Sequence, residues 1–201
     1  MYFMDDKTLR SIERLMRGVP NFKPRGHGLV VICRFDYEPV DETLAELLLW
    51  TFQNVRNPIF RRRLERYIAE CEDYDMRFKS EHHRRTFNEF IRKKDIKNKE
   101  LISALYLLTA DIKLSHIAKR CCDGNRILFG EMKLNGCSEE AYALCSAAKD
   151  LYLGTKYLGI YDLADADVIP FRIFGLICNA MVIRRFGIKA VLQTERNDSN
   201  D

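Results

Sequence analysis

The 201-residue sequence lacks the segments that mark membrane and secreted proteins. No apolar run approaches the roughly 20 residues that a membrane-spanning helix needs. The first residues, MYFMDDKTLRSIER, place acidic side chains where a secretory signal requires a basic start and an apolar stretch. The seven cysteines, an odd number, show neither zinc-site spacing nor a secreted disulfide framework. These absences predict a cytoplasmic protein with reduced cysteines, no metal site and no membrane partner.

Signatures of several enzyme classes are missing as well. AAKDLYLGTKYL lacks the glycine spacing of a nucleotide-binding loop and follows a helical pattern instead of a strand. Asp162, Asp165 and Asp167 lack the central glycine and closing glutamate of a calcium loop, so we expect them to cap helices. There is no nucleophile elbow, dinucleotide fingerprint or zinc-protease motif. We therefore expect no cofactor.

What the chain does have is the composition of a globular protein, 47% hydrophobic and 31% charged, and an uneven charge distribution. Residues 56–99 hold 14 Lys or Arg against 8 Asp or Glu, whereas residues 1–55 hold 7 against 8 and residues 100–201 hold 12 against 13. Clustered cations attract nucleic acid through release of its counterions. Nucleic-acid contact and a merely solvated charged face are the two interpretations of this segment.

Apolar periodicity predicts a mainly α (α+β) fold. Residues 1–72 are expected to form a small helix-strand-helix module, in which LVVICRFDY is the strand candidate and GVPNFKPRGHG is too rich in Pro and Gly to be regular. The acidic stretch AECEDYDM separates this module from a helical C-terminal domain, residues 76–190. Residues 191–201 are expected to be a disordered tail.

Capping residues predict where the helices begin and end. Helices are expected to start after side chains that can accept a bond from the first turn, namely Asn57, Ser80, Asp111 and Ser138. Glycines that suit a helix C-terminus follow two helices: Gly154 ends the helix that begins at Ser138, and Gly187 ends a last helix that starts near Pro170. The helix through ELISALYLLTA is expected to bury one side, with Leu101, Leu105 and Leu108.

Basic side chains fall on two predicted helices. In the first, which starts at Pro58, apolar periodicity points a stripe toward the core: Ile59, Phe60, Leu64, Tyr67 and Ile68. Its arginines are left mainly on the other surface: Arg61, Arg62, Arg63 and Arg66. The second group lies in and after the next helix: Arg84, Arg85, Arg92, Lys93 and Lys94. Together these nine side chains are the predicted RNA-binding residues.

Two adjacent histidines occupy the head of the second helix, in KSEHHRRTFNEFIRKKD. Steps of three and four from His83 reach Phe87 and Phe90, so His83 faces the core and His82 faces away. Adjacent helical residues point about 100° apart, so the pair cannot easily serve one scissile bond. His82, with Glu81 beside it, is the candidate general acid or base. A solvated helix end is the alternative.

Several segments also carry a family resemblance. From about residue 76 to 190, SEHHRRTFNEFI, ALYLLTAD, AYALCSAAKDLYLGT, IYDLADADVI and FGLICNAMVIRRFG follow in an order that resembles a poorly characterised family of small helical proteins from phages and conjugative elements of Gram-positive bacteria. Some of these proteins resemble anti-CRISPR proteins against type II RNA-guided nucleases, in at least one case acting through loss of guide RNA. The resemblance implies host-defence inhibition by a mobile-element protein.

Two functions are therefore expected. In the first, the protein engages a type II nuclease and its guide RNA, and, if it is an enzyme, it is an endoribonuclease acting on guide RNA. In the alternative, it is a non-catalytic protein-binding module of a mobile element that acts by occlusion. An enzyme needs an acid and a base that converge near the basic surface, whereas an occluding module needs only an exposed patch. The oligomeric state is left open.

Overall fold

The computed structural model divides the chain into two compact units, residues 1–37 and residues 38–201. The residues whose structure is described are 2–3, 22–25, 28–31, 43–73 and 77–188. Within these ranges the chain is mainly α, as the sequence predicts. None of the helices in them is long and apolar enough to cross a membrane.

The first unit contains a small antiparallel sheet in the order β1-β3-β2. Its strands are β1 (Tyr2–Phe3), β2 (Phe22–Arg25) and β3 (Gly28–Val31). The segment GVPNFKPRGHG thus contains a strand, which corrects the expectation of irregular structure. Pro24, paired with Leu29, is tolerated because β2 is an edge strand of this sheet. The expected first helix and residues 32–37 of the strand candidate lie outside the described residues.

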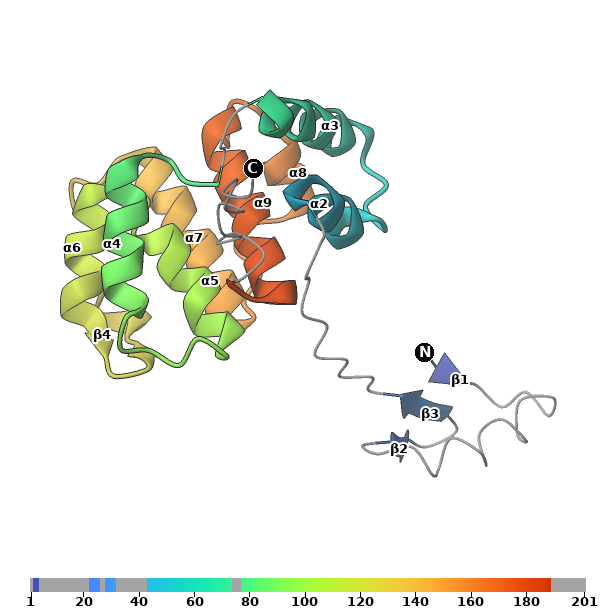
Figure 1. Ribbon diagram of the computed structural model, residues 1–201, viewed down its shortest axis with the longest axis horizontal. Helices are drawn as coiled ribbons and strands as arrows, with labels where there is room; N and C mark the ends of the chain where they lie inside the picture. The colour runs from blue at the N-terminus through green and yellow to red at the C-terminus, as the bar shows by residue number, and fades with distance from the viewer. Residues whose placement is uncertain (1, 4–21, 26–27, 32–42, 74–76, 189–201) are drawn as a thin grey trace, which may run out of the picture. The chain divides into compact units, whose positions relative to one another are not determined.

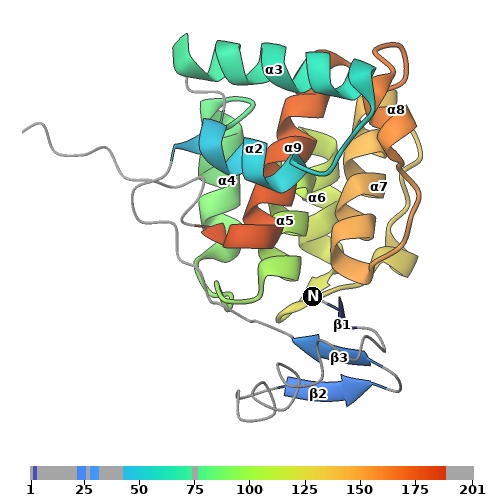
Figure 2. The same cartoon turned by 90° about the vertical axis from the view of Figure 1, so that its right-hand side faces the viewer.

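The second unit is a helical assembly (Figures 1 and 2). Its helices in the described part are α2 (Leu44–Phe52), α3 (Pro58–Asp73), α4 (Glu81–Ile91), α5 (Lys99–Leu108), α6 (Ile112–Cys121), α7 (Glu139–Leu153), α8 (Ile160–Ala164) and α9 (Phe171–Phe186). A short hairpin follows α6, formed by β4 (Cys122–Asp123) and β5 (Arg126–Ile127), and then a 3₁₀ turn, η1 (Phe129–Glu131).

The predicted capping residues are confirmed. Each side-chain oxygen accepts a hydrogen bond from a backbone N–H two or three residues farther on, at Asn57, Ser80, Asp111 and Ser138. Both predicted glycines follow their helices at positive φ, +72° for Gly154 and +97° for Gly187. Asp162 accepts from the Gly159 N–H at the start of α8, which is the capping role expected of it.

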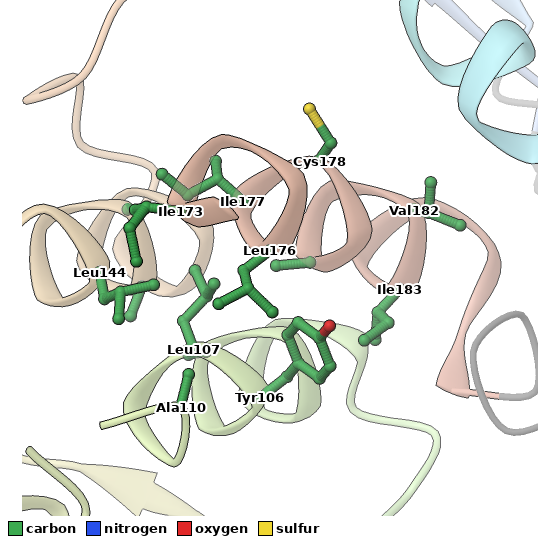
Figure 3. Packing of buried hydrophobic residues seen from close by; sticks show 14 of the residues in the cluster. Tyr106, Leu107, Ala110, Leu144, Ile173, Leu176, Ile177, Cys178, Val182 and Ile183 are labelled. Atoms are coloured by element: carbon green, nitrogen blue, oxygen red, sulfur yellow. The ribbon is translucent and has the colours of Figure 1, made fainter. Parts of the chain in front are cut away.

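Helix α5 runs through the core, packed against α7 and α9. All residues from 101 to 108 are buried, so the expectation of a single buried side was too narrow. Figure 3 shows Tyr106 and Leu107 of α5 facing Leu176 of α9, with Leu144 of α7 alongside. A helix covered on every side needs apolar residues around its whole circumference, and the sequence of α5 provides them.

Helices α2 and α3 belong to this same unit, which differs from the predicted division between residues 1–72 and 76–190. The Phe60 ring of α3 lies 5.0 Å from Phe52 of α2 and 5.3 Å from Phe174 of α9, centroid to centroid. The acidic stretch AECEDYDM is not all linker, because α3 continues to Asp73. Aromatic packing across the stretch therefore joins α2 and α3 to the helices that follow.

A buried polar network links three helices inside this core. The Tyr67 hydroxyl of α3 donates to Asn179 Oδ1 of α9 at 3.1 Å, and Asn179 Nδ2 donates to the Tyr106 hydroxyl of α5 at 3.2 Å. Burial raises the pKa of Tyr67, so its hydroxyl keeps its proton and can donate. The Tyr67 ring reaches this position because residue 175 of α9 is a glycine, where a Cβ atom would lie 2.3 Å from the ring.

Candidate nucleic-acid interface

His83 is a structural residue at the head of α4. Its side chain is buried, and the backbone N–H of Lys79 donates to its Nδ1 at 3.1 Å. Since Nδ1 accepts, Nε2 carries the hydrogen and donates to the Tyr106 carbonyl at 2.8 Å. The ring also packs 5.1 Å from Phe78, and burial lowers its pKa to about 4. The prediction that His83 faces the core is confirmed, and both of its ring nitrogens are occupied.

His82 points away from the core, as predicted, and is exposed. Its Nε2 lies 3.4 Å from the Thr86 hydroxyl, one turn along the helix. The carboxylate of Glu81 lies 3.8 Å from Arg84 Nε, so this side chain is oriented toward an arginine. The head of α4 therefore presents a single exposed imidazole, and the catalytic roles of His82 and Glu81 stay a prediction.

Three of the four predicted arginines of α3 bind their own chain. Arg61 donates to the carbonyls of Val55 and Gln53, at 2.7 and 3.1 Å, and so holds the loop between α2 and α3. Arg66 pairs with Glu70 at 2.9 Å. Its guanidinium carbon lies 4.3 Å from the centre of the Phe171 ring.

Arg63 departs furthest from its predicted position. It is half-buried, and its Nη1 donates to the carbonyls of Leu163 and Asp165, both at 2.8 Å. Its Nη2 donates to the Ile169 carbonyl. Five fixed donors make arginine suited to joining several carbonyls at once. Arg63 is thus a structural clamp between α3 and the chain around α8, and Arg62 is the α3 arginine left exposed without a partner in the described part of the chain.

The predicted cations in and after α4 are more accessible. Arg85, Arg92 and Lys93 are exposed. Arg84 is half-buried, with its guanidinium carbon 5.3 Å from the centre of the Phe78 ring. Lys94 donates from Nζ to the Gly124 carbonyl in the β4–β5 turn. Lys94 therefore ties the end of α4 to a hairpin that lies 30 residues later in the sequence.

This hydrogen bond lies in a region where basic residues far apart in the sequence come close together. Lys94 and Lys119 line one small hollow with Phe90 of α4 and Cys122 of β4. In Figure 1, α4 and α6 run side by side, and the β4–β5 hairpin lies at the end where both helices terminate. We call the exposed cations of residues 92–97, of the last turn of α6 and of the hairpin the basic end: Arg92, Lys93, Lys97, Lys119, Arg120 and Arg126.

The basic end keeps a positive surplus. Residues 89–97 and 119–126, which contain its six cations, carry three exposed acidic side chains: Glu89, Asp95 and Asp123. Lys119 and Arg120 occupy the last turn of α6, where a cation also offsets the partial negative charge of the helix C-terminus. That last-turn pattern is the sequence signal that could have pointed to them. The sequence could not have shown that Lys119 lies near Lys94, because this proximity depends on how α6 packs in the folded protein.

Among the described residues, no group of three or more His, Cys, Asp or Glu side chains could hold a metal ion. Comparisons with known protein families, with characterised proteins and with solved structures found no match to this chain.

Proposed function

We propose that the protein binds RNA through the basic end and, following the family resemblance, that this RNA is the guide RNA of a type II RNA-guided nuclease. The observation that supports the proposal is that six exposed cations lie in three segments, the loop after α4, the last turn of α6 and the β4–β5 hairpin, and that Lys94 and Lys119 bring these segments together. Lys and Arg on such a surface neutralise phosphates and release counterions, which gives affinity with little sequence preference.

Occlusion is the mode of action that the α4 geometry favours. General acid–base cleavage of a phosphodiester uses two groups within hydrogen-bond reach of the reacting oxygens. His83 is buried with both nitrogens occupied, and the exposed carboxylate of Glu81 lies against Arg84, which leaves His82 as the single exposed imidazole of α4. The protein would then inhibit host defence by covering guide RNA or the nuclease surface next to it, and the RNA would stay whole.

The first prediction concerns the basic end. Replacing Lys119, Arg120 and Arg126 by Ala should weaken guide-RNA binding and flatten its dependence on salt. Each phosphate that the protein no longer neutralises lowers the log–log slope by about 0.7 on a single strand and by about 0.9 on a duplex, so three such phosphates lower it by about 2 to 3. Fluorescence anisotropy with labelled guide RNA over a range of salt concentrations measures both quantities.

The matched control is a triple variant of the same net charge, in which Arg56, Lys133 and Lys156 become Ala. These side chains are also exposed cations, and they lie outside the basic end. It should bind RNA with nearly the wild-type slope. If both triple variants show an equally reduced slope, binding is a property of net charge and the basic end is not the site. An unchanged slope in both would overturn the RNA-binding proposal.

A further inference from the structure

A second surface, well apart in sequence from the basic end, is formed by α3, α8 and the start of α9. The two views in Figures 1 and 2 both place α8 beside α3. An open hollow of about 800 Å³ lies there. Its walls include Ile59, Arg62 and Arg66 of α3, Tyr161 of α8 and Phe171 of α9. We call this feature the α3–α8 hollow.

The hollow is held open by the contacts of its own walls. Arg63 donates to carbonyls at the end of α8 and in the loop after it, which fixes that loop against α3. The same guanidinium carbon lies 4.6 Å from the centre of the Phe174 ring. A surface preorganised in this way loses little conformational entropy when a ligand binds.

Apolar side chains are exposed on this surface. Ile59 was expected in the core but is 56% exposed, because the buried stripe of α3 runs through Phe60, Leu64 and Tyr67. Tyr161 is 83% exposed. Large apolar and aromatic side chains gathered around a concave surface are typical of protein-binding sites.

The charges on the two walls of the hollow indicate which class of ligand fits it. Arg62 is exposed and has no partner in the described part of the chain, and Arg66 lies one turn farther along the same helix face. The α8 wall carries Asp165, and Asp167 follows it, both exposed. A polyphosphate chain that spanned both walls would pass next to Asp165, which disfavours it there. A ligand with a single carboxylate, bound on the α3 wall next to an apolar group of the same ligand, matches this distribution of charge.

We propose that the α3–α8 hollow binds a peptide segment of a partner protein, one that carries an aromatic or large apolar side chain next to an Asp or Glu. The apolar side chain packs against Ile59 and Tyr161, and the carboxylate accepts a bidentate pair of hydrogen bonds from Arg62. This protein-binding site is separate from the RNA-binding surface and does not depend on it.

The test uses the full-length protein and three sets of short synthetic peptides. The first set carries one Trp or Phe flanked by Glu, the second replaces Glu by Lys, and the third replaces the aromatic residue by Ser. Fluorescence anisotropy gives the affinities. The tightest peptide is then titrated into ¹⁵N-labelled protein, and chemical-shift changes locate the site. We expect binding by the first set alone, with a Kd below about 1 mM, and shifts at Ile59, Arg62 and Tyr161.

Variants separate this site from the basic end. Arg62→Glu and Tyr161→Ala should each lower the affinity for the peptide by about tenfold or more, as expected for Arg and Tyr at the centre of an interface. Tyr142→Ala, which removes another exposed tyrosine, should leave peptide affinity unchanged. Arg120→Glu should lower the affinity for RNA and leave the affinity for the peptide unchanged. The folded state of every variant is checked by its melting temperature.

Four results would overturn the assignment. They are no binding by the acidic aromatic peptides, equal binding by the Lys-containing set, chemical-shift changes away from the hollow, and displacement of the peptide by oligouridylate. None of these bears on the salt slope of guide-RNA binding, so failure here is distinguishable from failure of the proposed function.

Discussion

At the scale of single residues, His83 makes the stability of the helical unit depend on pH. Its pKa falls from 6.5 to about 4, chiefly because burial disfavours the charged imidazole. A base whose folded-state pKa is lowered stabilises the fold fully above its unfolded pKa, and that contribution is lost as the pH falls from 6.5 toward 4. We expect the free energy of unfolding to drop by about 2 kcal/mol between pH 7 and pH 5, measured by urea unfolding.

Two variants isolate this effect from other titrating groups. His83→Gln should be less stable than the wild type at pH 7 but should lack this part of the pH dependence. His116→Gln, which changes an exposed histidine of α6, should keep it. If the wild type and His83→Gln lose the same free energy between pH 7 and pH 5, His83 is not the residue responsible.

At the scale of helices, the contact between α3 and α9 depends on Gly175. An added Cβ would lie 2.3, 2.7 and 2.9 Å from three carbons of the Tyr67 ring, whose hydroxyl is held by Asn179. Gly175→Ala should therefore destabilise the protein by about 1 to 3 kcal/mol in thermal or urea unfolding. Helix propensity alone favours Ala over Gly by about 1 kcal/mol, so a stabilised variant would show that the helices do not pack this closely.

Gly130→Ala provides the comparison for this substitution. No atom of the described neighbours lies within 4 Å of a Cβ added at Gly130, and its φ is not positive. The change should move the free energy of unfolding by less than about 0.5 kcal/mol. A similar loss at both glycines would mean that the effect of Gly175→Ala does not come from the Tyr67 ring.

At the scale of the whole molecule, the mode of inhibition separates the two expected functions. If the protein occludes a nuclease and its guide RNA, His82→Ala should inhibit as well as the wild type, and the guide RNA should keep its length on a denaturing gel. If His82 is a general acid or base, the same variant should lose guide-RNA cleavage by about 100-fold or more. Shortened RNA with the wild type and intact RNA with the variant would overturn occlusion.

The sequence by itself determined the features that depend on neighbours within one or two turns. Capping by Ser80 and Asp111 is a contact between residues three apart, and the opposite directions of His82 and His83 follow from helix geometry alone. The mainly α fold was predictable for the same reason, because apolar periodicity is a local pattern.

Tertiary structure decided which of the side chains predicted to be exposed on a helix contact another element. Helical periodicity places Arg63 beside the stripe of Phe60 and Tyr67, yet only packing of α8 against α3 gives Arg63 three carbonyls to bind. Lys119 meets residues near Lys94 because α4 and α6 end beside one hairpin. Such partners lie tens of residues away, and a periodic pattern tells which face of a helix is covered without telling what covers it.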